Sequence, residues 1–175
     1  RDNDRDDDQL EGNGMGSMAY DRPRLPAVAL PAKVDPPEDE GKDFGYALET
    51  AGGIVRAMPL LAPIFWVLAG DIYAPEFEFS PEKMATFEQS PHLAHIWLVP
   101  NPAHNPAGDF GMSLDGKALN LPKPNKLFTF STFALYKKEF FEASFTAMPI
   151  GNPQGTAAPL APLLRAAMDR GQVGA

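Results

Sequence analysis

Apolar and polar positions follow regular patterns from about residue 41 to the end of the chain. The continuous apolar run 64–69 predicts a strand that is buried on both faces of a parallel sheet. A second apolar run, 93–99, predicts another strand, and a third, 128–136, alternates small and aromatic residues as long strands do. These three runs predict the core of a sheet.

The segments around these runs contain helix signals. Thr50 is predicted to cap a helix whose apolar face is formed by Ile54, Met58 and Leu61. Segment 81–89 has a proline near its start, which favours a short helix. Residues 139–141 begin another short helix. Residues 157–170 are predicted to form an amphipathic helix, which Gly171 is expected to close.

Two irregular segments separate the second and third strands. Residues 101–108 combine prolines and asparagines, which predicts a loop. The segments 110–114 and 118–121 flank Asp115-Gly116, a pair typical of a hairpin turn. Strands and helices that alternate, with an inserted hairpin, predict a three-layer α/β fold.

Residues 1–40 differ in composition from the rest. Residues 1–8 hold five aspartates, 11–17 are rich in glycine, and 23–37 contain five prolines without a regular apolar period. Low hydrophobicity combined with charge and proline favours disorder. We therefore predict an unstructured tail, or a segment not native to the fold, followed by a partial domain over 41–175.

Composition narrows the class of protein. The formal net charge is −8 without a cluster of Lys or Arg, which argues against a nucleic-acid-binding protein. The chain has no cysteine, so it has neither disulfides nor a thiolate nucleophile. No apolar run reaches the roughly 18 residues that span a bilayer, and the Asp-rich start is unlike a signal peptide. These features predict a soluble cytoplasmic protein of undetermined oligomeric state.

Two elements carry candidate chemistry. The small residues of Thr50-Ala51-Gly52-Gly53 let the backbone approach either a nucleobase or phosphate at a helix start, or a packed neighbour. Asp71 follows an apolar strand, where ligands bind in open α/β sheets. A carboxylate there suits Mg²⁺, which takes one or two carboxylates plus phosphate oxygens; a turn or helix-cap role is the alternative.

Other motifs are excluded. His92, His95 and His104 do not have the spacing of a zinc site. Asp109-Phe110-Gly111 has the letters of the kinase magnesium tripeptide, but the other kinase motifs are absent from the sequence. Ser131 lacks the surroundings of a hydrolase nucleophile. The aromatic residues of 128–141 are expected in the core.

Several spaced motifs together point to a family. They occur in the order 48–53, an apolar strand that ends in Gly70-Asp71, 101–110, 128–131 and 158–164. In this order they resemble the sugar-phosphate nucleotidyltransferases, most closely the N-acetylmuramate-1-phosphate uridylyltransferases of bacterial cell-wall recycling. Segment 48–53 alone is also similar to mannose-1-phosphate guanylyltransferases.

The resemblance implies a Rossmann-like three-layer mixed sheet and an enzyme that joins a nucleoside triphosphate, UTP by preference, to a sugar 1-phosphate and releases pyrophosphate. It implies that Asp71 is the catalytic residue that holds Mg²⁺. The residues it places around the nucleotide and the sugar are Glu49, Thr50, Gly52, Gly53, Asn101, Gly108, Asp109 and Thr129.

The sequence also departs from the family pattern. Residues 1–40 lack the Gly-x-Gly-x-Arg loop and the Pro-Lys-Pro segment that open family members, and the chain ends before their second metal-binding aspartate. We therefore expect a fold that is incomplete at both ends. A guanylyl or thymidylyl transferase, a non-catalytic nucleotide- or sugar-binding remnant, and a product that does not fold stably are the alternatives.

Overall fold

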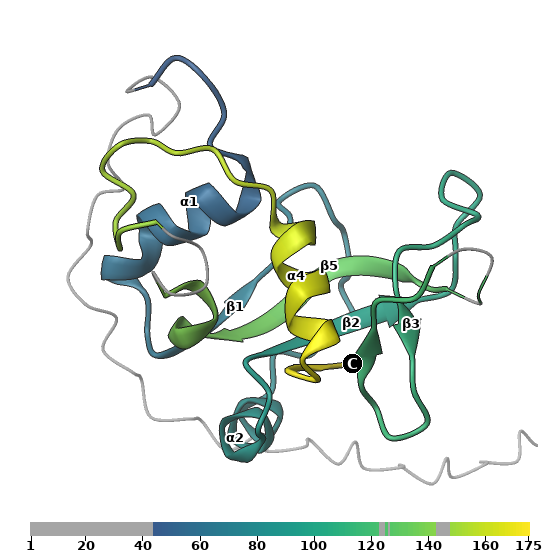
Figure 1. Cartoon of the computed structure of the whole chain (residues 1–175). Coiled ribbons are helices and arrows are strands. Elements are labelled where there is room, and N and C mark those ends of the chain that lie inside the picture. The colour runs from purple at the N-terminus through teal and green to yellow at the C-terminus, as the bar shows by residue number, and fades with distance from the viewer. Residues whose placement is uncertain (1–43, 123–124, 126, 143–147) are drawn as a thin grey trace, which may run out of the picture. The chain divides into compact units, whose positions relative to one another are not determined.

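The computed structural model describes residues 44–122, 125, 127–142 and 148–175 (Figure 1). The prediction for residues 1–40 lies outside this part of the chain. The helices are α1 (Glu49–Ala57), α2 (Pro81–Gln89) and α4 (Leu160–Asp169), with 3₁₀ turns at Met58–Leu60 and Lys138–Phe141. The strands are β1 (Ile64–Val67), β2 (Ala94–Val99), β3 (Gly111–Met112), β4 (Ala118–Leu119), β5 (Thr129–Lys137) and β6 (Val173–Gly174).

Four strands form one mixed sheet in the order β1-β5-β2-β6. The long strand β5 pairs antiparallel with both β1 and β2, whereas β6 runs parallel to β2. The expected mixed α/β sheet is thus confirmed. The expectation of a parallel strand over 64–69 is wrong, because β1 is shorter, pairs only with β5 among the described strands, and buries Phe65 while its other residues stay half-buried.

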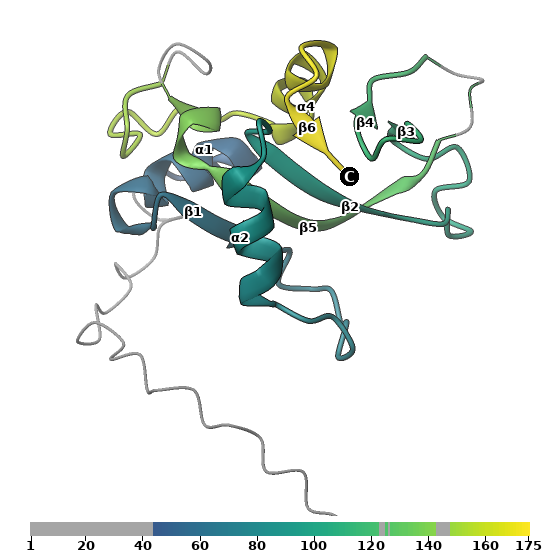
Figure 2. The same ribbon diagram turned by 90° about the horizontal axis from the view of Figure 1, so that it is seen from below.

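Helices lie on both sides of this sheet (Figure 2). Helices α1 and α4 share one side with the main core, which includes Val55, Ile96, Tyr136 and Leu164. On the other side α2 places Phe87 against the ring of His95. The hairpin of β3 and β4 forms where Asp115-Gly116 predicts it, with Gly116 at φ +76°.

Local signals set the ends of two helices, with Pro81 and Gly171 in the positions that the sequence predicts. Ser80 accepts a hydrogen bond from the Lys83 N–H (3.1 Å) and Pro81 is the first residue of α2, which matches the preferred chemistry of a helix start. Gly171, at φ +68°, follows α4 and donates its N–H to the Met168 carbonyl (2.8 Å).

The start of α1 differs from the prediction. Thr50 lies inside the first turn, and the capping position is Leu48, which makes no side-chain cap. Instead, the N–H groups of Ala51 and Gly52 both donate to the carbonyl of Ala158 (3.0 and 3.2 Å), while Ala158 donates back to Leu48. Because Ala158 makes these hydrogen bonds with the start of α1 and Pro159, the N-cap residue of α4, is extended, that helix begins at Leu160 rather than at residue 157.

The two glycines of α1 give the first testable prediction. A Cβ at Gly52 would lie 2.6 Å from the Thr156 carbonyl oxygen, whereas a Cβ at Gly53 would meet nothing within 4 Å. We expect Gly52→Ala to lower the free energy of unfolding by about 1–3 kcal/mol through overpacking. Gly53→Ala, the matched control, should raise it by about 0.5–1 kcal/mol because a helical glycine is replaced. Urea unfolding measures both; equal effects would contradict the packing of α1 on 156–158.

Tyr136 carries the second prediction. Its ring packs against Phe140 and Phe141 (5.1 Å each), and within the described residues its buried hydroxyl has no hydrogen-bond partner. Burial raises the pKa of Tyr136 well above its usual range. An unsatisfied buried hydroxyl is costly, so Tyr136→Phe should stabilise the protein by about 1 kcal/mol.

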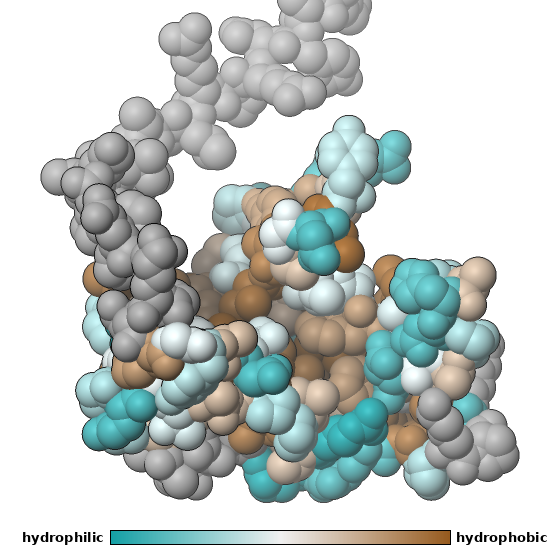
Figure 3. Space-filling model, turned by 90° about the horizontal axis from the view of Figure 1, so that it is seen from above, coloured by the Kyte–Doolittle hydropathy of each residue, from teal (hydrophilic) through white to brown (hydrophobic). Residues whose placement is uncertain are grey.

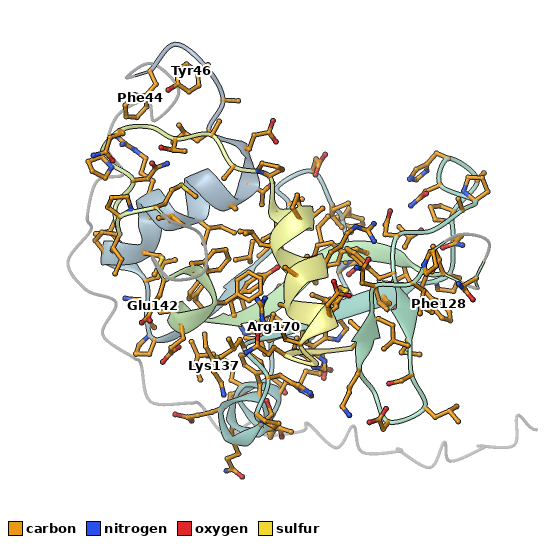
Figure 4. The ribbon with its side chains drawn as sticks, in the orientation of Figure 1. Phe44, Tyr46, Phe128, Lys137, Glu142 and Arg170 are labelled. Atoms are coloured by element: carbon orange, nitrogen blue, oxygen red, sulfur yellow. The ribbon has the colours of Figure 1, made fainter. Side chains whose placement is uncertain are left out.

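A matched tyrosine gives the opposite expectation. The hydroxyl of Tyr46, which Figure 4 labels in the loop before α1, donates to the Gly155 carbonyl (3.0 Å). Tyr46→Phe should therefore leave stability unchanged or lower it by up to about 1 kcal/mol. Thermal unfolding of the two variants decides: a lower Tm for Tyr136→Phe would show that its hydroxyl has a partner.

No helix in the described part of the chain is both long and apolar enough to cross a membrane.

Candidate functional site

A hollow of about 480 Å³ opens between the starts of α1 and α4, β5 and the chain that follows β1. Figure 3 looks onto this face, where apolar residues occupy the recess and hydrophilic residues surround it. The residues that line it are Glu49, Thr50, Val67, Leu68, Ala69, Asp109, Phe110, Phe130, Thr132, Pro159, Leu160, Ala161, Leu164 and Arg165. An apolar recess with a few polar groups is the usual form of a small-molecule site.

The polar groups of the hollow come from distant parts of the sequence. Glu49 and Thr50 belong to the first turn of α1, Asp109 precedes the hairpin, and Arg165 lies in the middle of α4. The hollow thus offers two carboxylates, two hydroxyls and one guanidinium around apolar walls. Three of the residues predicted from sequence, Glu49, Thr50 and Asp109, are brought together in it.

Four further interactions fix the loop that carries Asp109. Its carboxylate accepts from the Phe130 N–H (2.9 Å) and from the Asn105 side chain (3.1 Å). The Asn105 amide also donates to the Thr129 hydroxyl (3.2 Å), which donates to Asn101 (3.0 Å). The loop and β5 are therefore joined by one polar network, which holds Asp109 at the edge of the hollow.

Gly108 allows this network to close. Its φ is +67°, and a Cβ there would lie 2.8 Å from the Asn101 Oδ1 and 2.8 Å from the Leu127 carbonyl carbon. Asn101, Gly108 and Thr129 thus lie close to Asp109, although of these four residues only Asp109 reaches the wall of the hollow. These residues position the loop rather than line the recess.

Two residues of the hollow have a strained backbone. Glu49 has φ +60° and Thr132 has φ +69°, a conformation that costs a β-branched residue about 1–3 kcal/mol. Thr132 stands where the register of β2 and β5 shifts, and its hydroxyl accepts from the Ala69 N–H (3.2 Å). This bond holds the chain that leads from β1 to Asp71.

The other predicted residues lie outside the hollow. Asp71 is exposed in the turn after β1, two residues beyond Ala69, which lines the hollow. Gly52 packs on the 156–158 segment, as the close-packing interpretation expects, whereas a Cβ at Gly53 would meet nothing within 4 Å. The role of these three residues in binding stays a prediction.

Sequence reasoning missed Arg165 and Thr132. Arg165 donates to the Asn120 side-chain oxygen (2.8 Å) and to the Asp109 carbonyl (3.3 Å), and its guanidinium stacks 4.9 Å from the centre of the Phe110 ring. The available signal was a lone arginine among apolar residues in an amphipathic helix. The contacts of Thr132 depend on the fold, and no sequence motif indicates them.

A second cavity, of about 510 Å³, lies on the α2 side of the sheet and includes His92, His95 and Trp97. Burial is the main cause that lowers the pKa of both histidines; nearby Lys117 lowers that of His92 further. Lys137, labelled in Figure 4, donates to the carbonyls of Glu88 (3.1 Å) and of Ser90 (2.8 Å), and Ser90 lines this cavity. This cavity contains none of the residues predicted from the motifs.

Comparisons with known proteins agree with the motif-based prediction. The chain is 37% identical over 128 residues to a protein of Neisseria meningitidis serogroup B (strain ATCC BAA-335 / MC58), named N-acetylmuramate alpha-1-phosphate uridylyltransferase. The match covers 72% of this chain and 52% of that relative, so the chain spans about half the length of the curated relative. No protein-family model matches the chain. The resemblance predicted from the sequence is confirmed.

Proposed function

The chain is related to the sugar-phosphate nucleotidyltransferases, and from this premise we propose that it joins UTP to N-acetylmuramate 1-phosphate and releases pyrophosphate. In such a reaction a phosphate oxygen of the sugar attacks the α-phosphorus of the nucleotide, and the bond to the leaving pyrophosphate breaks. The protein mainly positions the two phosphates and offsets their charge. The proposal includes a cytoplasmic place in cell-wall recycling, where this sugar arises.

The observation that carries the proposal is the meeting of Glu49, Asp109 and Arg165 around one apolar hollow. Carboxylates accept hydrogen bonds from sugar hydroxyls, and a guanidinium donates to an anionic group. The apolar walls suit the methyl groups and the ring face of an acylated sugar. We therefore assign the sugar 1-phosphate to the hollow, with the nucleotide beside the turn that contains Gly52 and Gly53.

The proposal includes Mg²⁺, which Asp71 would bind. The described residues contain no group of three or more His, Cys, Asp or Glu that could hold a metal by themselves. An exposed single carboxylate fits the type of magnesium site in which phosphate oxygens and water complete the shell. Asp71 would hold the ion between the substrate phosphates, and the bond from Ala69 to Thr132 would keep its turn in place.

The test is pyrophosphate release by the full chain with Mg²⁺, for each of UTP, GTP, dTTP and CTP with N-acetylmuramate, glucose and mannose 1-phosphates. We expect the highest rate with UTP and N-acetylmuramate 1-phosphate. A preference for GTP with mannose 1-phosphate would instead support a guanylyltransferase.

A second function, binding without catalysis, is supported by the same hollow, because its apolar walls and polar groups would hold a ligand whether or not that ligand reacts. It predicts saturable binding of the nucleotide or the sugar 1-phosphate, but no pyrophosphate with any pair. Titration calorimetry beside the rate assay separates it from catalysis. Pyrophosphate release above the protein-free control, with any pair of nucleotide and sugar 1-phosphate, would contradict binding without catalysis.

A further inference from the structure

Arg165 is held in the hollow, and among the described residues no carboxylate pairs with its charge. Its described contacts are the Asn120 side-chain oxygen, the Asp109 carbonyl oxygen and the Phe110 ring, and none of these is a carboxylate. A guanidinium has five N–H donors, and these two hydrogen bonds use about two of them. The half-buried cation therefore retains both charge and donors for a ligand.

The neighbours of Arg165 keep it from pairing with an acid. Asp169 lies four residues later on α4, a spacing that commonly gives an Arg–Asp pair. Here both Asp169 carboxylate oxygens instead accept from the Asn120 amide nitrogen (3.0 and 3.1 Å). Asn120 thus stands between the two charges, with its nitrogen toward Asp169 and its oxygen toward Arg165 (2.8 Å). The arrangement orients the guanidinium without neutralising it.

We propose that Arg165 recognises a carboxylate on the sugar, so that the hollow selects acidic sugar 1-phosphates over neutral ones; this rests on the proposed function. In that function the reacting phosphate lies beside Asp71, on the chain that follows β1. Arg165 belongs to another wall, formed by α4, Asp109 and Phe110. An arginine with a planar set of donors matches a carboxylate in a two-bond geometry.

The charge of the hollow explains why the arginine is needed. Glu49 and Asp109 suit sugar hydroxyls, but their negative charges repel a carboxylate of the ligand. Without Arg165 an acidic sugar would bind more weakly than its neutral analogue. Arg165 reverses that order, which makes it a specificity-determining residue.

The test uses four ligands that differ in one group at a time: N-acetylmuramate and N-acetylglucosamine, each with and without the 1-phosphate. Titration calorimetry on the full chain gives the ratio of affinities for the acidic and neutral sugars. In Arg165→Met we expect this ratio to fall about 10- to 100-fold, the size of a lost charge-assisted interaction. Affinity for N-acetylglucosamine 1-phosphate should stay within about twofold, which also shows that the variant is folded.

Two further variants sharpen the result. Arg56→Met is the matched control, because Arg56 also stacks 4.9 Å from a phenylalanine ring, that of Phe44, but does not line the hollow; the ratio should not change. Asn120→Ala frees Asp169 to pair with Arg165, and should lower the ratio although Arg165 is intact. A variant that merely loosened the fold would weaken all four ligands alike.

The contrary outcomes are distinct. If Arg165→Met weakens both 1-phosphates equally, Arg165 binds the phosphate and the carboxylate assignment is wrong. An unchanged ratio would overturn it as well. Selective binding of the acidic sugars without pyrophosphate release would contradict nucleotidyl transfer but support the role of Arg165 in carboxylate recognition. Turnover with equal preference for acidic and neutral sugars would contradict only the role of Arg165, and binding of none of the four ligands would overturn both.

Discussion

Replacing Gly108 with alanine should lower the free energy of unfolding by about 2–5 kcal/mol. The loss has two causes: residue 108 has a left-handed backbone conformation, and the new Cβ would overlap with neighbouring atoms of the loop. The φ of +67° disfavours any side chain. The added Cβ would also lie 2.8 Å from the Asn101 Oδ1, 2.8 Å from the Leu127 carbonyl carbon and 2.9 Å from the Leu127 Cβ. Leu127 is buried, so relief by rotation of a flexible side chain is not available.

A matched glycine separates the two causes. Gly171 has φ +68°, but nothing lies within 4 Å of its missing Cβ. Gly171→Ala should therefore lower the free energy of unfolding only by the cost of the left-handed conformation, about 1–2 kcal/mol. Urea unfolding gives the free energy of unfolding of both variants, and the difference between their losses is the cost of the steric overlap at Gly108. Equal losses of stability in the two variants would show that the 101–109 loop adjusts to the added Cβ without cost. Gly108 would then serve only as a turn residue.

The same substitution should disturb the hollow. Asn101 would have to move away from Gly108, and its bonds with Thr129 and with the Leu127 carbonyl would weaken. Asp109 follows Gly108 directly, so its hydrogen bonds to Phe130 and Asn105 would weaken too. We expect Gly108→Ala to reduce sugar 1-phosphate affinity, whereas Gly171→Ala should leave it unchanged.

The fold was predictable from sequence where the signals are local. Ser80-Pro81 marks the start of α2, and Asp115-Gly116 marks the hairpin, because caps and turns depend on a few adjacent residues. The direction of β1 was not predictable. An apolar run reports burial, whereas the neighbour of a strand is set by contacts distant in sequence; here β1 pairs with β5 about seventy residues later. The two-residue strand β6 is too short to leave a periodic pattern.

The site was predictable only where a motif marks it. Glu49 and Asp109 lie in motifs and meet in the hollow. The cap predicted at Thr50 is wrong because a carbonyl from residue 158, far along the chain, accepts the hydrogen bonds of the first turn instead. Arg165 was missed for a similar reason: its orientation depends on Asn120, forty-five positions earlier, and on the packing of α4.

The second large effect is expected at Asp71. Asp71→Asn keeps the size of the side chain but removes the charge proposed to hold Mg²⁺ between the phosphates. Loss of one group that stabilises transition-state charge typically lowers turnover about 100- to 1000-fold, and we expect a loss in this range. Asp71 is exposed, so the free energy of unfolding should change by less than about 0.5 kcal/mol. The measurement is pyrophosphate release across a range of Mg²⁺ concentrations.

Glu76→Gln is the matched control, because Glu76 is another exposed carboxylate five positions further along the same segment. It removes the same charge from the region, so a general loss of negative potential would affect both variants equally. We expect only Asp71→Asn to raise the Mg²⁺ concentration needed for half-maximal rate. If the unaltered chain binds UTP without turnover, the same pair is compared for Mg²⁺-dependent UTP affinity. An unchanged affinity in Asp71→Asn would then remove Asp71 from the metal site and leave the turn role as its explanation.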